Sequence, residues 1–84
     1  MPDVHEKTVT LLIFVTVRSV WYECRFSHRY TLNECFDLLQ HKLLHESLTP
    51  KPAMFLDQET NQYLDPDIPL IRLGITRSRY IIVC

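Results

Sequence analysis

Histidines and cysteines are the side chains in this 84-residue chain that could bind a metal or attack a substrate. His41 and His45 are four residues apart in a stretch that predicts a helix, with Asp37 one turn earlier, so all three would share one face. Paired histidines at this spacing can share a metal ion, but two ligands rarely make a structural site and no HExxH motif is present. We favour the alternative interpretation, a solvated polar face with an Asp37–His41 pair, and predict no metal site.

The three cysteines, Cys24, Cys35 and Cys84, make no catalytic or disulfide pattern. An odd count without CxxC spacing disfavours a disulfide framework and a zinc module, and reduced thiols fit a cytoplasmic protein. A nucleophilic thiol needs an adjacent base and a group that orients the base, and no segment places all three together. We therefore predict no enzyme activity and no cofactor. A small thiol enzyme or a metal-binding protein remains the less favoured alternative.

Basic side chains on a predicted sheet edge suggest a different chemistry, which is binding. Arg25 and Arg29 lie on or just after a strand predicted over 21–26, and Lys42 on the helix could join them. An edge strand offers backbone N–H and C=O groups that a partner strand can complete. Glu23 dilutes this basic patch, so the alternative that the charges only protect an edge from aggregation carries more weight. Arg25 and Arg29 are nevertheless candidate partner-binding residues.

An apolar sheet face is the other candidate binding surface. Strands predicted over 7–17 and 79–84 are apolar on both faces, yet one helix can cover only one of them. An apolar patch left exposed is typical of a binding or dimer surface, unless the N-terminal residues or the loop 50–52 cover it. One of two sets must face outward, either Leu11, Ile13, Val15, Tyr80 and Ile82 or Leu12, Phe14, Ile81 and Val83. We take the second set as the predicted partner-binding surface, with a homodimer as one possible use.

These residues must be positioned by one amphipathic helix, predicted over 30–47, and the strands around it. Thr31 followed three residues later by Glu34 predicts a capping box at its start. An apolar stripe at helical spacing predicts the side packed on the sheet, and its members are Leu32, Cys35, Phe36, Leu39 and Leu43. Short strands are expected at 53–56 and 62–64, and a turn ending at Gly74, the single glycine, precedes the last strand. The first and last strands should pair in parallel at the centre.

Length and composition predict one small globular domain, residues 1–84, and we expect residues 1–6 to be flexible. The chain is 46% hydrophobic and 23% charged, with a formal net charge of −1, which provides no general field for nucleic acid. Asp3 and Glu6 oppose a signal peptide, and the longest apolar run is too short to span a bilayer. We therefore expect protein partners, no nucleic acid and no membrane insertion.

From about Thr8 to Val83 this order of elements resembles the ubiquitin-like β-grasp fold. The capped helix after a hairpin fits the opening half of that fold, and 53–56 with 62–64 is similar to its third and fourth strands. The closing segment carries most of the likeness, through Leu70, Leu73, Gly74, Ile75 and the strand Tyr80-Ile81-Ile82-Val83. The resemblance implies an α+β domain with a mixed four- to five-stranded sheet over one main helix.

The ending of the sequence departs from the conjugated members of that fold. Ubiquitin and the sulfur carriers end in Gly-Gly, whereas this sequence ends in Ile82-Val83-Cys84, so conjugation is not expected. Its size and ending are similar to the bacterial YukD/EsaB type, cytosolic accessory or regulatory components of type VII secretion. That resemblance implies an interaction module for a secretion-system membrane component or ATPase. The alternative is a Ras-associating or Ras-binding type of module, which binds a small GTPase through its second strand.

Overall fold

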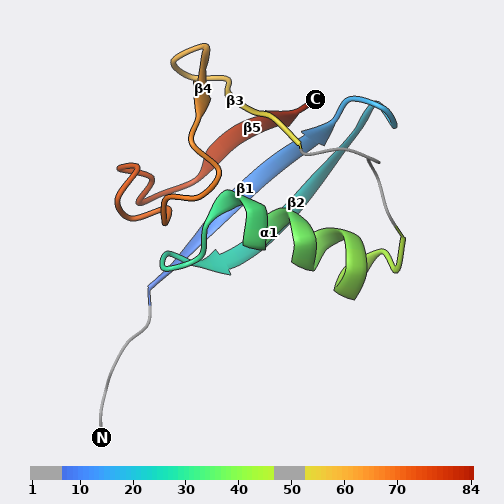
Figure 1. Ribbon diagram of the computed structural model, residues 1–84, viewed down its shortest axis with the longest axis horizontal. Coiled ribbons are helices and arrows are strands. Elements are labelled where there is room, and N and C mark those ends of the chain that lie inside the picture. Colours follow the sequence, from blue (N-terminus) through green and yellow to red (C-terminus); the bar gives the residue numbers. More distant parts are fainter. Residues whose placement is uncertain (1–6, 47–52) are drawn as a thin grey trace, which may run out of the picture.

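The computed structural model describes residues 7–46 and 53–84 and contains a mixed five-stranded sheet packed on one helical segment (Figure 1). In chain order the elements are β1 (Thr8–Val15), β2 (Val20–Ser27), α1 (Leu32–Leu38), η1 (Leu39–Leu43), β3 (Phe55–Asp57), β4 (Gln62–Leu64) and β5 (Arg79–Val83). The predictions for residues 1–6 and for the loop 48–52 lie outside the described residues. The helix, predicted to continue to Ser47, already ends at Leu43, and residues 44–46 are not helical.

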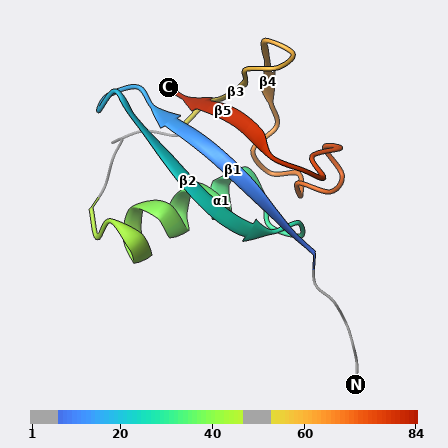
Figure 2. The same cartoon turned by 180° about the vertical axis from the view of Figure 1, so that it is seen from behind.

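The sheet order is β2-β1-β5-β3-β4, so the first and last strands form the central pair. β1 and β5 run parallel, as predicted, and every other neighbouring pair is antiparallel. The helix lies across one face of the sheet in Figure 1, and Figure 2 shows the opposite face without a described element over it. The expected α+β class is confirmed.

The core lies between the helix and the inner face of the sheet, which we define as the face that the helix covers. Alternate residues of β1 supply its centre, because successive side chains of a strand point to opposite faces. Burial of one such side chain contributes about 1.5–3 kcal/mol. The buried hydrophobic residues are Val9, Leu11, Ile13, Val15, Phe26, Leu32, Cys35, Phe36, Leu39, Phe55, Leu70, Ile75, Ile81 and Val83.

The predicted capping box starts the helix. The Glu34 N–H donates to the Thr31 hydroxyl oxygen at 3.1 Å, and the Thr31 N–H donates to the Glu34 carboxylate at 2.8 Å. Both bonds satisfy amides of the first turn that have no partner inside the helix. The adjoining loop is fixed to the same end, because the Leu70 N–H donates to the Tyr30 carbonyl at 2.8 Å.

The second half of the helix departs from the predicted stripe. Residues 39–43 form a π-helix, with the Leu44 N–H donating to the Leu39 carbonyl at 3.0 Å. This wider turn shifts the face that reaches the core by one residue. Leu43, predicted inside, is therefore 58% exposed, while Leu44 packs against the core in its place. Within residues 7–46 and 53–84, no helix has the length and apolar character to cross a membrane.

Gly74 provides the sharp turn that returns the chain to β5. Its φ of +82° lies in the left-handed region that favours glycine, as the sequence predicted. The Ile75 N–H donates across this turn to the Leu70 carbonyl at 3.0 Å, and both side chains are buried. The turn therefore anchors the loop into the core immediately before the last strand.

Candidate interaction surface

A row of apolar side chains crosses the outer face of the sheet, the face that the helix leaves uncovered. The strand registers place one residue from each strand directly beside the next. In sheet order this outer row consists of Trp21, Phe14, Ile82, Leu56 and Tyr63. Strands lie about 4.8 Å apart, so four spacings give a row about 19 Å long. The aromatic residue at each end is exposed, Trp21 by 44% and Tyr63 by 58%.

Three aromatic rings form a cluster at the β2 end of this row. The ring centroids of Phe14 and Trp21 are 5.0 Å apart, and those of Trp21 and Tyr80 are 5.5 Å apart with planes at 86°. β2 and β5 flank β1, so the Trp21 and Tyr80 rings meet above β1. Edge-to-face pairs contribute about 0.5–1.5 kcal/mol beyond area burial and restrict the rings. Tyr80 is still 49% exposed, so the cluster presents ordered aromatic surface.

The predicted outer set is correct for β1 and wrong for β5. Leu12 and Phe14 point outward and are half-buried. Ile81 and Val83, predicted beside them, belong to the core, with Ile81 0% exposed. The parallel register explains the error, because Leu12 lies opposite Tyr80 and Phe14 lies opposite Ile82. The outward residues of β5 are therefore Tyr80 and Ile82, which the sequence had assigned to the opposite alternative.

The arginines lie near one edge but do not form the expected patch with Lys42. β2 is an edge strand, as the arginine hypothesis requires. Arg25 is exposed on the outer face opposite Thr10, and Arg29 is exposed in the turn that follows β2. Lys42 lies on η1, which packs against the inner face. Arg25 and Lys42 are thus presented on opposite sides of the sheet.

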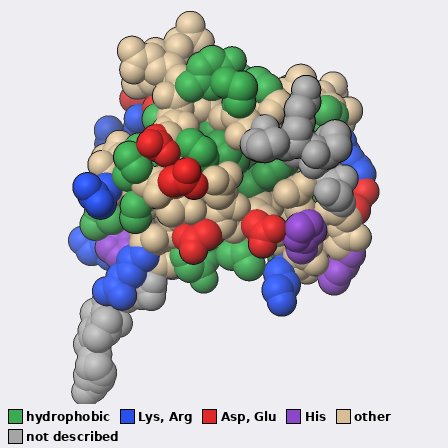
Figure 3. Space-filling model, viewed as in Figure 1, with side chains coloured by type: hydrophobic (Ala, Val, Ile, Leu, Met, Phe, Trp, Pro, Cys, Tyr) green, Lys and Arg blue, Asp and Glu red, His purple; other side chains and the backbone are tan. Residues whose placement is uncertain are grey.

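The histidines and cysteines are not arranged for chemistry in the part of the chain that the structure describes. His41 Nδ1 lies 3.0 Å from the Asp37 carboxylate, the exposed pair that the sequence predicted. Figure 3, viewed from the helix side, shows histidine side chains toward both ends of this face and several carboxylates between them. Among residues 7–46 and 53–84, no three His, Cys, Asp or Glu side chains are grouped to hold a metal ion.

Two of the thiols are held in their protonated form. Burial, with a smaller contribution from the Glu34 and Cys24 charges, raises the pKa of Cys35 to about 12. Burial and then the neighbouring Glu23 carboxylate raise the pKa of Cys24. The thiolate is the nucleophilic form, so these shifts oppose thiol chemistry at both positions.

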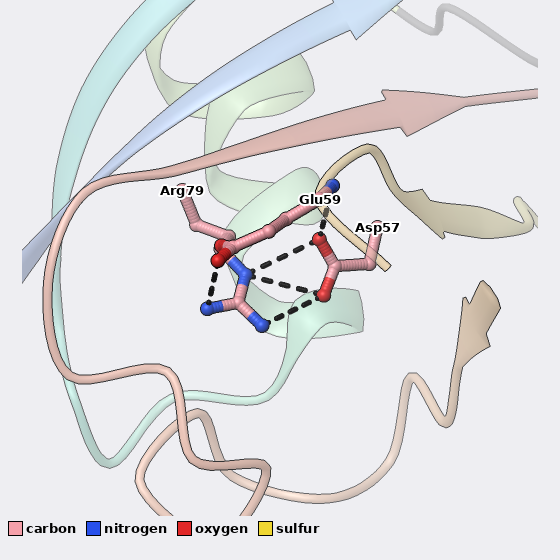
Figure 4. Close-up of polar contacts among 3 residues, drawn as sticks. All are labelled: Asp57, Glu59 and Arg79. Carbon is pink, nitrogen blue, oxygen red and sulfur yellow. Dashed lines mark hydrogen bonds and ion pairs between the residues drawn. The ribbon is translucent and has the colours of Figure 1, made fainter. Parts of the chain in front are cut away.

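A buried ion pair on the inner face was missed by the sequence analysis. Arg79 Nε and Nη2 donate to the Asp57 carboxylate, with Nη2 at 2.8 Å, and Nη1 lies 3.2 Å from Glu59 (Figure 4). Burial by itself raises the pKa of Asp57, which is 1% exposed. The Arg79 and Thr60 side-chain bonds, the Glu59 amide and the Arg79 charge outweigh that effect and lower the pKa of Asp57. This ion pair holds β3 to β5 and leaves Asp57 ionised.

Solved structures with this arrangement of strands and helix are ubiquitin-like. No protein-family model matches the chain, and no curated protein matches its sequence. A de novo design based on ubiquitin superposes with a TM-score of 0.70 at 12% identity, covering 95% of this chain and 90% of the design.

Two natural domains from tubulin-associated proteins are also similar in structure. The C-terminal ubiquitin-like domain of mouse tubulin-specific chaperone e has a TM-score of 0.65 at 16% identity, covering 96% of this chain and 89% of that one. The ubiquitin-like domain of tubulin-binding cofactor B has a TM-score of 0.61 at 16% identity, with coverages of 92% and 88%. Identities this low show the fold alone. The chain has the ubiquitin-like β-grasp fold.

Proposed function

We propose that this chain is a non-catalytic ubiquitin-like module that binds another protein through the outer face of its sheet. The exposed aromatic cluster supports this proposal most directly. Trp21 and Tyr80 keep large exposed surfaces although each ring packs against a neighbour. Ordered aromatic residues in an apolar row are the type of side chain that contributes most to protein interfaces. The partner surface would therefore be apolar where it contacts the outer row, with polar groups at its rim.

The proposed setting is the cytoplasm, where the module would act as an accessory or regulatory component of a type VII secretion system. This part of the proposal rests on the resemblance to the YukD/EsaB type. The partner would be the cytosolic region of a membrane component or of the ATPase of that machine. Affinity would come from the outer row, and orientation from Arg25 at the rim.

The alternative is a small-GTPase-binding module, and one observation favours keeping it. β2 is an edge strand, and Arg25 is exposed on it. A GTPase with an acidic edge could add to that strand. GTP-dependent binding that Arg25→Glu abolishes, with the outer-row variants unaffected, would favour this alternative.

Two variants on the outer face, compared with a control of matched exposure on the helix side, test this surface. Tyr63 in the outer row and Leu43 on η1 are each 58% exposed. We expect Tyr63→Ala and Tyr80→Ala to weaken binding of the purified ATPase cytosolic domain about tenfold, which corresponds to about 1.4 kcal/mol. Leu43→Ala should change the Kd less than about twofold, because it lies on the helix side.

Titration calorimetry with these variants separates the outcomes. Weakening by Leu43→Ala with no effect of Tyr80→Ala would reject the outer face as the binding surface. Absence of binding to the ATPase and membrane components would reject the secretion role. Concentration-dependent dimerisation that Tyr80→Ala removes would replace the proposed partner with a second copy of the chain.

A further inference from the structure

The backbone hydrogen bonds show which groups of β2 face its free edge. The His28 N–H donates to the Lys7 carbonyl at 3.0 Å, one position beyond the pair Thr8 and Ser27. Bonded and non-bonded pairs alternate along an antiparallel ladder. The β2 residues bonded to β1 are therefore Phe26, Cys24 and Tyr22. The residues that alternate with them turn their N–H and C=O groups away from the sheet, and they are Trp21, Glu23 and Arg25.

The other side of β1 gives the same assignment independently. The Thr16 N–H donates to the Val83 carbonyl at 3.1 Å, so even-numbered residues of β1 bond to β5. Odd-numbered residues are then left for β2, in agreement with the first assignment. Among residues 7–46 and 53–84, no other hydrogen bond reaches the outward backbone groups of Trp21, Glu23 and Arg25. β2 spans eight residues, whereas β4, at the opposite edge, spans three.

The two charged side chains on this edge, Glu23 and Arg25, form no ion pair within the described residues. Glu23 lies opposite Leu12, and Arg25 lies opposite Thr10. Opposite charges on directly paired residues stabilise neighbouring strands, and like charges destabilise them. An added strand would therefore pair a basic residue with Glu23, an acidic residue with Arg25 and an apolar residue with Trp21.

We propose that β2 accepts an extended segment of a partner protein as a sixth, antiparallel strand with outward side chains in the order acidic, basic, apolar. From its N-terminus that segment has the pattern acidic-x-basic-x-apolar. The apolar residue extends the outer row by one strand beyond Trp21. The partner thus contributes backbone hydrogen bonds at the edge as well as apolar contacts on the face. This inference deepens the proposed binding function and uses a separate set of groups.

Two synthetic peptides test the charge order. The first is acetyl-Thr-Glu-Thr-Lys-Thr-Ile-Thr-amide, and the second exchanges its Glu and Lys. We expect the first to bind at least fivefold more tightly and to slow hydrogen exchange at the amides of Trp21, Glu23 and Arg25, measured by NMR on the full chain. The double variant Glu23→Lys with Arg25→Glu should reverse the preference. Equal binding of both peptides, or no binding of either, overturns the proposal.

A proline variant tests the backbone contribution separately. The Glu23 N–H faces the free edge, so Glu23→Pro removes an edge donor without removing a ladder bond to β1. We expect a folded protein that binds the first peptide at least tenfold more weakly, while Glu23→Gln retains the backbone donor and stays within about threefold. Undiminished peptide binding by a folded Glu23→Pro variant rejects edge addition. Loss of protein binding in Tyr80→Ala without loss of peptide binding would show that the outer face and the edge act separately.

Discussion

The two faces of the central strands differ in environment far more than in composition. Ile81 and Ile82 are consecutive isoleucines on β5, yet Ile81 is fully buried under the helix and Ile82 is half-buried in the outer row. On β1 the same alternation separates Ile13 from Phe14. The inner face has a covering element from its own chain, and the outer face has none among the described residues. Similar apolar side chains therefore serve folding on one face and are available for binding on the other.

Substitution of the two adjacent isoleucines should give the largest difference between the faces, measured as the change in the free energy of unfolding. Ile81→Ala should lower the free energy of unfolding by about 3 kcal/mol, because it leaves a cavity in a packed core. Ile82→Ala should lower it by less than about 1 kcal/mol, because solvent and neighbours can fill the space. Urea unfolding of both variants measures the difference. Equal losses would show that the outer face is as important to folding as the inner face.

The Asp57–Arg79 ion pair is the charged part of the inner face, and its loss should be the next largest effect. Arg79→Ala leaves the Asp57 carboxylate buried without its main partner, which costs about 3 kcal/mol. Arg25→Ala, a change of the same kind on the outer face, should alter stability by less than about 0.5 kcal/mol. Thermal unfolding at neutral pH compares the two arginines. If Arg25→Ala lowers stability as much as Arg79→Ala, the two faces do not differ in how their arginines contribute to folding.

The same ion pair should give the inner face a dependence on acid pH. The pKa of Asp57 in the folded protein lies below its ordinary value of 3.8, so the ionised form is favoured by folding. Its contribution is fully present above that ordinary value and is lost as the pH falls through the lower folded value. Asp57→Asn should therefore lose less stability than the wild type between pH 5 and pH 2, approximate limits set by carboxylate titration. Parallel acid profiles of the two proteins would contradict this assignment.

The smallest expected difference is in thiol labelling. It distinguishes the inward-facing cysteines from the exposed one and involves no change in stability. Cys35 and Cys24 point inward with raised pKa values, whereas Cys84 is exposed. Ellman's reagent at pH 8 should label Cys84 quickly, Cys24 slowly and Cys35 only on unfolding, because the thiolate reacts. A Cys84→Ser variant identifies the fast phase. Fast labelling of Cys35 in the folded protein would mean that the inner face opens readily.

Local patterns predicted the elements, while long-range register decided the site. Thr31 and Glu34 are close in sequence, so the capping box could be predicted from their spacing. The alternation within β1 was equally visible, but the offset between β1 and β5 depends on the whole intervening chain. Leu12 was therefore grouped with Ile81 instead of Tyr80. An error of one residue moves every side chain of a strand to the other face.

Two other differences between the predictions and the structure arose from features that leave no local pattern in the sequence. The π-helical turn has no distinctive spacing in 39–43, so the stripe was continued to Leu43 instead of Leu44. Asp57 and Arg79 are distant in sequence, and only the antiparallel pairing of β3 with β5 brings them together. Trp21 was not among the residues predicted to bind a partner, although its position opposite Phe14 places it on the outer face.

The parallel pairing of β1 with β5 has a consequence for synthesis on the ribosome. β1 emerges long before β5, and the residues between them take on the order of several seconds to translate at 5–20 residues per second, a typical range. During that interval the nascent β1–β2 hairpin lacks β5, so the backbone groups of β1 that later bond to β5 remain unpaired. A chaperone that shields this strand would act before the final segment leaves the exit tunnel.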